Sequence, residues 1–293
     1  MRIGSRCRRT HAVAAVALAC ALGSVGVSGV AQAAVGPGGY PVTSLVYAGG
    51  HWAPADTAAI HPGVVTATNM TSCTANFLYT DGAHVYLGQA AHCSAGVPGA
   101  TNGCTTPSLP LGTPVRLPGS DVIGTIAYNS WVAMQDAHEQ NADACAHNDL
   151  ALIRLPDSAI ARANPSVPVF GGPVGINTVG TTPGEQVLSY GNSPLRQGIG
   201  LLAAKTGTSL GDSGQGWMHQ IYTVTPGIPG DSGSAVLDSA GRALGDLTTL
   251  EFAPVPGANH VSDLAHELAW ARAHVAGFHN LRLIAGTEPF LAG

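Results

Sequence analysis

The chain has 293 residues, and its 17 acidic residues outnumber its 12 basic residues, among which Lys205 is the sole lysine. A nucleic-acid-binding protein would show the opposite balance of charge and a basic patch, so we expect no nucleic-acid partner. The acidic balance favours solubility and identifies no partner by itself.

A secretory signal peptide is predicted over residues 1–33. Four arginines stand among the first nine residues, an apolar run follows over 12–22, and small residues end in Ala31-Gln32-Ala33. This order of segments is typical of a cleaved export signal. The apolar run is broken by glycines and is shorter than the roughly 20 residues that span a bilayer, which argues against a membrane anchor. We therefore expect a secreted, extracellular protein with no membrane association after cleavage.

The next segment, residues 34–59, is rich in Gly, Pro and Ala, which predicts a flexible arm or a short pro-segment. From residue 60 to residue 293, short β-rich runs alternate with Gly, Pro, Asn and Asp. Two sets of short strands at this spacing indicate an all-β fold of the sandwich or barrel type. The predicted strands lie at 63–68, 73–80, 84–91, 112–117, 121–128 and 149–155, and then at 168–170, 186–191, 199–205, 217–225, 234–238 and 242–250.

One stretch departs from the β pattern. Apolar residues recur at helical spacing over residues 261–275, with Ser262 as a possible N-cap and Gly277 as a plausible stop. The sequence therefore predicts a C-terminal helix whose apolar stripe packs on the last barrel. A short strand-like piece at 281–284 follows it.

Four cysteines remain once the signal peptide is removed, and an even count in an exported chain predicts two disulfides. The sequence alone allows three pairings of these cysteines. They do not occur in the C-x-x-C pairs of a zinc site, so no metal is expected. The four residues are Cys73, Cys93, Cys104 and Cys145.

Three motifs carry candidate chemistry, and the first is Gln89-Ala90-Ala91-His92-Cys93 at the end of a predicted strand. If this strand forms a hairpin with the preceding one, Cys73 comes close to Cys93, and a disulfide would hold the loop that carries His92. A general base needs such rigid placement. The alternative is an ordinary loop histidine beside a structural cystine.

The second motif places Asp149 at the head of the apolar strand Leu150 to Leu155. A carboxylate that enters a protein interior needs a polar partner, and a histidine N–H would serve while fixing the tautomer of that ring. The alternative is that Asp149 only caps a turn.

The third motif is Pro229-Gly230-Asp231-Ser232-Gly233-Ser234, followed by an apolar strand. Glycines on both sides let backbone N–H groups turn toward a ligand, and two such groups near a serine hydroxyl make an oxyanion hole. The four letters G-D-S-G also occur at 211–214, so Ser213 competes with Ser232. We favour Ser232 because a predicted hairpin follows it directly, whereas Ser213 precedes a loop tip.

Together, and in the order His, Asp, Ser, these motifs resemble those of the chymotrypsin-like serine peptidases, especially the secreted bacterial branch. The segment QAAHC corresponds to the family's T/S-A-A-H-C, NDLALIRL to its D-I-A-L-type strand, and PGDSGSAVL to its G-D-S-G block. The resemblance covers about residues 60–275. It implies two packed six-stranded antiparallel β-barrels, at about 60–156 and 166–252, with a C-terminal helix.

The resemblance also implies an activity, namely hydrolysis of peptide bonds in protein or peptide substrates through an acyl-enzyme intermediate. It requires no cofactor or metal, and we expect a monomer. It implies a Cys73–Cys93 disulfide beside the histidine, and we expect the second to join Cys104 and Cys145. The implied catalytic residues are His92, Asp149 and Ser232, with the oxyanion hole formed by the N–H groups of Gly230 and Ser232.

The sequence departs from the family pattern near its N-terminus. Animal members pair a newly cut N-terminus with the acid beside the nucleophile, but here no basic residue lies between 34 and 115 to direct such a cut. We therefore expect Asp231 to have a different partner, which the sequence does not identify. No acid stands at 223–229, near the expected floor of the specificity pocket, which argues against Arg or Lys at the cleaved position unless Asp246 or Glu251 intrudes.

Two alternatives remain open from the sequence. A GDSL-type esterase would use Ser213 with Asp263 and His266, although that fold needs alternating strands and helices with its serine near the N-terminus. A non-catalytic binding protein could instead have kept the peptidase fold. The other histidines, such as His84, His138, His147 and His219, belong to no motif, and surface or strand positions are expected for them.

Overall fold

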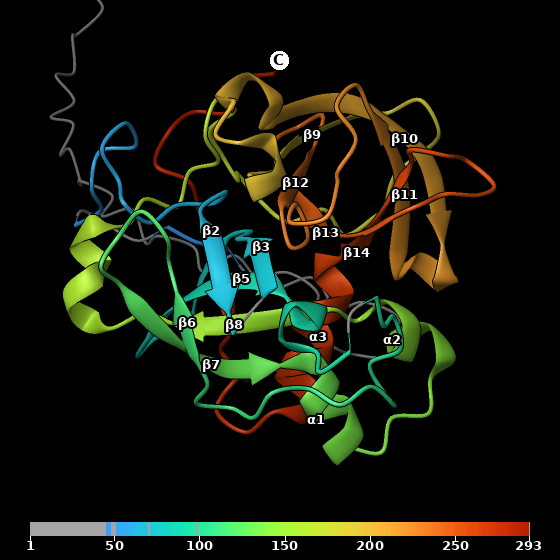
Figure 1. The fold of residues 1–293 in the computed structure, drawn as a ribbon, viewed down its shortest axis with the longest axis horizontal. Coiled ribbons are helices and arrows are strands. Elements are labelled where there is room, and N and C mark those ends of the chain that lie inside the picture. The colour runs from blue at the N-terminus through green and yellow to red at the C-terminus, as the bar shows by residue number, and fades with distance from the viewer. Residues whose placement is uncertain (1–44, 48–50, 70, 98, 293) are drawn as a thin grey trace, which may run out of the picture. The chain divides into compact units, whose positions relative to one another are not determined.

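Strands dominate the structure, as the alternating β-rich runs predict. The computed structural model describes residues 45–47, 51–69, 71–97 and 99–292, and the signal peptide predicted at 1–33 lies outside them. The strands of the second half form a closed antiparallel barrel in the order β10-β11-β14-β13-β12-β9 (Figure 1). These strands are β9 (Gln186–Tyr190), β10 (Ala204–Ser213), β11 (Met218–Thr223), β12 (Ala235–Asp238), β13 (Ala243–Leu250) and β14 (Asn259–Asp263).

The strands of the first half belong to a nine-stranded sheet in the order β1-β15-β4-β5-β8-β7-β6-β2-β3. Seven of these strands are neighbours in the order β4-β5-β8-β7-β6-β2-β3. The first and the last of the seven, β4 and β3, are separated along the chain only by residues 75–77, so the sheet curls around a core. The strands are β1 (Leu45–Val46), β2 (Val65–Thr68), β3 (Thr71–Thr74), β4 (Leu78–Thr80), β5 (Val85–Ala90), β6 (Pro114–Arg116), β7 (Ile123–Asn129), β8 (Leu150–Arg154) and β15 (Arg282–Ile284).

Each β unit encloses its own apolar core. Along β7, buried and less buried side chains alternate, as expected for a strand with one face in a core. In the first unit, Leu87, Ile126 and Ile153 are fully or almost fully buried in one cluster. In the second unit, a separate cluster consists of Val187, Ile221, Val236, Leu244, Leu247 and Val261. The predicted all-β fold with a C-terminal helix is confirmed. Its second half is a closed six-stranded antiparallel barrel as expected, whereas the first unit is part of a nine-stranded sheet.

Three element predictions were wrong. The strand expected at 199–205 contains the 3-10 helix η4 (Gly200–Leu202) instead, and β10 begins only at Ala204. Residues 261–263, expected to open the C-terminal helix, instead end β14, because Val261 and Ser262 pair with both β11 and β13. The helix, α3 (Leu264–His274), therefore starts later and takes Asp263 as its N-cap. The strand expected at 168–170 is a turn closed by the bridge between Val167 and Gly171, so β14 supplies the sixth strand of the second barrel.

Two short helices between β7 and β8 were not predicted. Helix α1 (Ser130–Asp136) begins where the Asn129 side chain accepts hydrogen bonds from two backbone N–H groups, and Asn141 caps α2 (Ala142–His147) in the same way. Asparagine is a favoured N-cap for this reason. The remaining turns include the 3-10 helices η1 (Ala91–Ser94), η2 (Asp157–Arg162), η3 (Pro194–Arg196), η4 (Gly200–Leu202) and η5 (Gly214–Gly216).

The described part of the predicted arm is attached to the rest of the chain. Strand β1 pairs in parallel with β15. The Ala53 N–H donates to the carbonyl of Ala163, and its carbonyl accepts a hydrogen bond from Asn164 Nδ2. Trp52 packs against the core of the first unit. In the described ranges, no helix has the length and apolar character needed to span a bilayer.

Candidate active site

His92 and Asp149 come from neighbouring strands. His92 lies in η1, directly after β5, and Asp149 directly precedes β8. The pairing of Ala90 with Leu150 therefore brings the two residues together. The Asp149 carboxylate accepts two hydrogen bonds from His92, one from Nδ1 at 2.6 Å and one from the backbone N–H at 2.8 Å. Both the position and the ring orientation of His92 are thereby fixed.

The charge of Asp149 acts on the His92 ring. Burial opposes protonation of the imidazole, but the adjacent carboxylate outweighs burial and raises the pKa of His92. Because Nδ1 is committed to Asp149, Nε2 is the nitrogen that remains to exchange a proton with another group. This arrangement suits a base that becomes transiently positive.

The disulfide Cys73–Cys93 is present beside His92, with a separation of 20 residues along the chain. It joins β3 to η1, the turn that carries the histidine. The next residue of β3, Thr74, contacts the serine loop of the second barrel: its N–H donates to Ser232 O at 2.9 Å, and its hydroxyl donates to Gly230 O at 2.8 Å. One strand thus connects the histidine turn to the serine loop.

The serine loop leaves two backbone N–H groups without acceptors. Among the described residues, the N–H groups of Gly230 and Ser232 donate to no protein atom, although their neighbours Asp231, Gly233 and Ser234 all donate to backbone oxygens. Gly230 and Gly233 have φ values of 95° and 85°, which favour glycine. A Cβ at residue 233 would also lie 2.5 Å from the Thr74 carbonyl oxygen. This geometry suits the binding of a developing oxyanion.

The structure identifies the partners of Asp231, which the sequence could not. The carboxylate is fully buried and lies 2.7 Å from Arg196 Nη2 and 3.3 Å from Lys205 Nζ. It also accepts a hydrogen bond from the Ser193 N–H at 2.9 Å. Burial lowers the pKa of Lys205, while Asp231 opposes this shift. Two cations from the second barrel therefore anchor the residue between Gly230 and Ser232.

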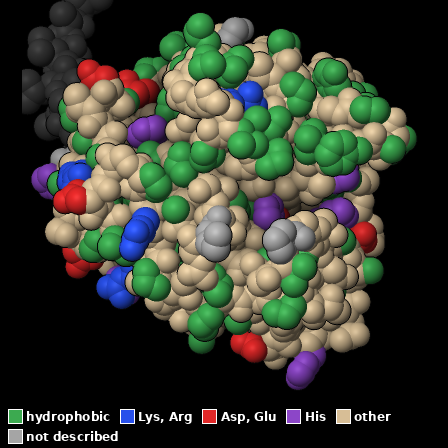
Figure 2. Space-filling view, viewed as in Figure 1, with side chains coloured by type: hydrophobic (Ala, Val, Ile, Leu, Met, Phe, Trp, Pro, Cys, Tyr) green, Lys and Arg blue, Asp and Glu red, His purple; other side chains and the backbone are tan. Residues whose placement is uncertain are grey.

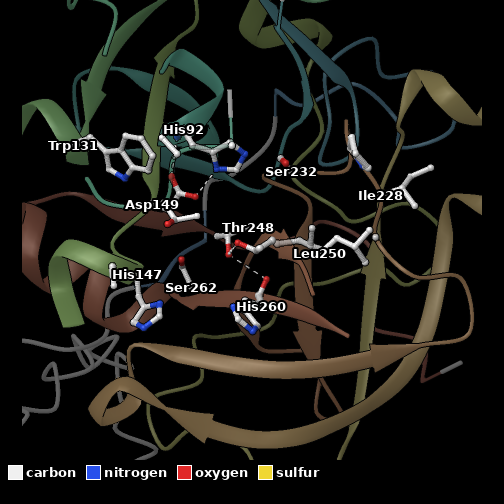
Figure 3. Close-up of a pocket in the computed structure, with 18 of the residues that line it drawn as sticks. His92, Trp131, His147, Asp149, Ile228, Ser232, Thr248, Leu250, His260 and Ser262 are labelled. Carbon is white, nitrogen blue, oxygen red and sulfur yellow. Dashed lines mark hydrogen bonds and ion pairs between the residues drawn. The ribbon is translucent and has the colours of Figure 1, made fainter. Parts of the chain in front are cut away.

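A cavity of about 700 Å³ contains His92, Asp149 and Ser232 in its lining. Figure 3 shows the His92 ring with Asp149 on one side and Ser232 beyond its other side. Among the described residues of the lining, Asp149 carries the one carboxylate. The walls are apolar side chains with hydroxyls and two further histidines, including Trp131, Ile228, Leu247, Phe252, His147 and His260. The space-filling view shows a hollow with histidine side chains at its edge (Figure 2).

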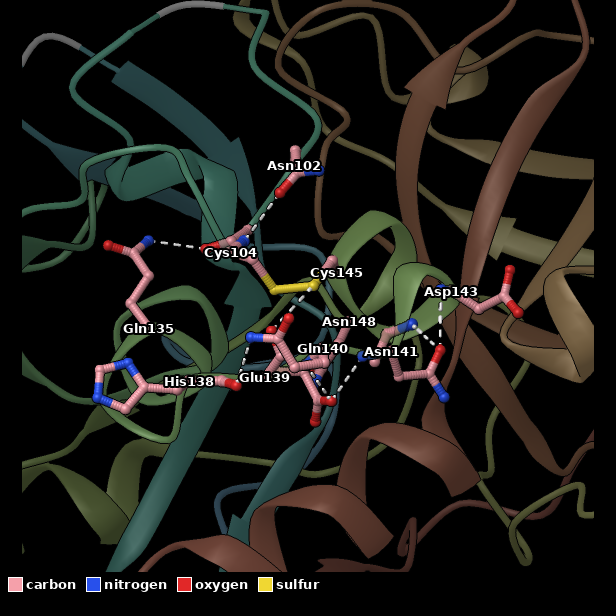
Figure 4. The surroundings of a disulfide bond; sticks show 12 residues. Asn102, Cys104, Gln135, His138, Glu139, Gln140, Asn141, Asp143, Cys145 and Asn148 are labelled. Carbon is pink, nitrogen blue, oxygen red and sulfur yellow. Dashed lines mark hydrogen bonds between the residues drawn. A yellow bond between two sulfur atoms is a disulfide. The ribbon is translucent and has the colours of Figure 1, made fainter.

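The second disulfide, Cys104–Cys145, supports the rim of this cavity. It joins the loop that contributes residues 99–101 to the lining with helix α2, whose end contributes His147. The Gly103 N–H donates to Cys145 O at 2.8 Å, and Gln135 Nε2 donates to Gly103 O at 2.7 Å (Figure 4). Both expected cysteine pairings are therefore present.

The competing serine lies elsewhere. Ser213 ends β10 at the tip of a hairpin, and its hydroxyl is directed at the Met218 sulfur, 3.9 Å away. The other two esterase candidates do meet, with His266 Nδ1 2.7 Å from Asp263. Within the described residues, however, no hydrogen bond links Ser213 to His266. The antiparallel barrel around them also differs from the alternating strands and helices that such an esterase needs.

Sequence reasoning missed several residues of this region. His147 and His260 were unassigned, yet both line the cavity. His219, expected on a strand or at the surface, lies on β11 and is fully buried between two carboxylates. Lys205 was also missed, although the sequence held a clue to its role. It is the single lysine of the chain and lies in a β-rich segment, and a buried lysine needs an acidic partner.

No known family model and no curated protein sequence matches the chain. Solved structures do match, at low sequence identity. Thermobifida fusca protease A is 15% identical with a TM-score of 0.45, over 78% of this chain and 99% of that one. A Nocardiopsis protease is 17% identical with a TM-score of 0.46, over 77% and 98%. Cellulomonas bogoriensis chymotrypsin is 17% identical with a TM-score of 0.44, over 77% and 98%. The chain is thus similar to bacterial chymotrypsin-like serine proteases.

Proposed function

We propose that this protein is a secreted serine endopeptidase with Ser232 as nucleophile, His92 as general base and Asp149 as the residue that orients the base. The observation that carries the proposal is a cavity lined by Ser232 and by a histidine that is hydrogen-bonded to a buried carboxylate. The serine loop also holds two backbone N–H groups that, among the described residues, donate to no protein atom. These are the groups that acyl transfer requires.

The proposed reaction assigns one role to each of these groups. The Ser232 hydroxyl attacks the scissile carbonyl carbon while His92 Nε2 accepts its proton, and Asp149 stabilises the resulting imidazolium. The negative oxygen of the tetrahedral intermediate accepts hydrogen bonds from the Gly230 and Ser232 N–H groups. His92 then donates the proton to the leaving amine, which breaks the peptide bond. Water then attacks the acyl-enzyme through the same proton transfers, which releases the carboxylic acid product and restores the Ser232 hydroxyl.

The cavity lining supports a substrate without a basic side chain at the cleaved position. Of the lining residues that the structure describes, Asp149 alone has a carboxylate, and it is already hydrogen-bonded to His92. Glu251 is engaged instead by Gln220 and by His260 at 3.4 Å, and Asp246 is buried. A peptide-library profile should therefore show no preference for Arg or Lys, whereas a strong basic preference would overturn this part of the proposal.

The decisive experiment compares Ser232→Ala with Ser213→Ala. We expect Ser232→Ala to lower kcat on a peptide substrate on the order of 10⁴-fold or more, while Ser213→Ala stays near the unmodified rate. A fluorophosphonate should label the tryptic or chymotryptic peptide that contains Ser232. Equal losses in both variants would contradict the assignment of the nucleophile. Failure of the folded protein to react with the probe or to cleave peptides would favour a binding protein with this fold.

A further inference from the structure

Two buried carboxyl groups lie behind the His92–Asp149 pair, and the proposed reaction does not use them. Asp246 lies on β13 and is 1% exposed, and Glu267 lies on α3 and is 0% exposed. Glu267 Oε1 accepts a hydrogen bond from the Asp149 backbone N–H at 2.9 Å. The helix therefore supports the residue that orients His92.

The remaining oxygens of this pair have no donor. Among the described residues, neither oxygen of Asp246 and not Glu267 Oε2 accepts a hydrogen bond from any protein group, and no arginine or lysine forms an ion pair with either residue. A buried carboxylate with neither a cation nor a donor is costly.

The two carboxyl groups lie near each other, where strand β13 packs against helix α3, and each acts electrostatically on the other. Carboxylates are acceptors only, so a hydrogen bond between two of them requires that one carries a proton. The titratable groups that face the pair are His92, Asp149, Tyr79 on β4 and Tyr128 on β7. Of these groups, His92 alone can be positively charged, and its charge is already paired with the Asp149 carboxylate.

We infer that Asp246 and Glu267 share one proton, and that this singly charged pair positions Asp149 and, through it, His92. The effect on His92 rests on the proposed function, whereas the shared proton does not. Burial, followed by the repulsion from neighbouring carboxylates, raises the pKa of both groups, in agreement with the missing donors. One negative charge then remains, held by the hydrogen bond from the Asp149 N–H.

A retained proton has a thermodynamic signature. Because the folded state keeps a proton that an unfolded carboxyl group releases near about pH 4, folding loses stability as the pH rises above that value, until the folded pair itself ionises. Each retained proton makes the unfolding equilibrium constant rise about tenfold per pH unit. Asp246→Asn and Glu267→Gln each replace the shared proton by an amide N–H, so each should remove this rise.

The first test measures urea unfolding between about pH 5 and pH 8 on the Ser232→Ala protein, together with the infrared C=O stretch of protonated carboxyl groups. We expect the unfolding equilibrium constant of the parent to rise about tenfold more per pH unit than that of either single variant, and the infrared band to appear in the parent but in neither single variant. Asp238→Asn is the matched control, because Asp238 is equally buried but pairs with Arg242 at 2.6 Å, and it should keep both signals. Identical pH dependence in the parent and both single variants would overturn the inference.

The second test measures the acid limb of kcat/KM, which reports the pKa of His92. Each single variant keeps the one negative charge, so its acid limb should stay where it is in the parent. The double variant Asp246→Asn/Glu267→Gln removes that charge, so the limb should move to lower pH. A single variant that shifts the limb about half as far as the double variant would show that both groups are ionised, because it would then remove one of two charges. If the protein cleaves no peptide, the proposed function fails. The unfolding and infrared data still show whether Asp246 and Glu267 share a proton.

Discussion

The buried His219 gives a quantitative prediction about stability. Its Nδ1 lies 2.7 Å from Asp212 and its Nε2 lies 3.0 Å from Asp263, so both ring nitrogens donate and the ring is an imidazolium. Burial opposes this charge, but the two carboxylates outweigh burial and raise the pKa of His219 from 6.5 to about 9. At 1.36 kcal/mol per unit, the shift corresponds to about 3 kcal/mol of folding free energy.

The sign follows from the raised pKa. The contribution is fully present below about pH 6.5 and is lost as the pH rises through about 9. Solvent reaches Asp212, whose side chain is 23% exposed, and weakens its ion pair with His219. We therefore expect His219→Gln to lower the free energy of unfolding by about 2 to 3 kcal/mol more at about pH 6 than at about pH 9.5.

Urea unfolding at both pH values measures this difference. His84→Gln is the control, because its ring pairs with Asp81 at 3.1 Å but is one third exposed, so this substitution should lower the free energy of unfolding only slightly. An equal cost of His219→Gln at the two pH values would refute the reasoning.

Two further predictions concern the supports of the cavity. Arg196→Met should lower the free energy of unfolding by about 3 kcal/mol or more, because among the described residues it leaves the buried Asp231 with Lys205 as its one cation. It should also lower kcat. Unchanged unfolding with unchanged kinetics would contradict the anchoring role. The double variant Cys104→Ala/Cys145→Ala opens a loop of 41 residues, so it should lower the free energy of unfolding by about 4 kcal/mol. It should also raise KM more than it lowers kcat. A loss confined to kcat would contradict a role at the rim of the cavity.

The sequence predicted most strands because their apolar runs are short and bounded by turn residues. It failed where tertiary contacts decide between two local structures. Val261 and Ser262 fit a helical spacing, but pairing with two neighbouring strands holds them in β14. The short helices after Asn129 and Asn141 have few residues and no long apolar period, so their side-chain caps were the available signal.

The candidate site shows the same division. The residues His92, Asp149 and Ser232 stand in local motifs, and the structure brings all three to one cavity. Asp246 and Glu267 stand in no motif, and their importance depends on a helix and a strand that meet only in the folded chain. Sequence patterns identify groups that act with their sequence neighbours, whereas buried charge pairs between distant segments require coordinates.

The strand β15 has a consequence for the order of folding. It follows the second barrel in the chain, yet it pairs with β4 of the first unit and with β1 near the beginning of the described chain. The edge of the first sheet therefore stays unprotected until residues 282–284 have been synthesised. Unpaired strand edges invite aggregation, so the nascent first half would need a chaperone or delayed folding, and truncation before residue 282 should yield insoluble protein.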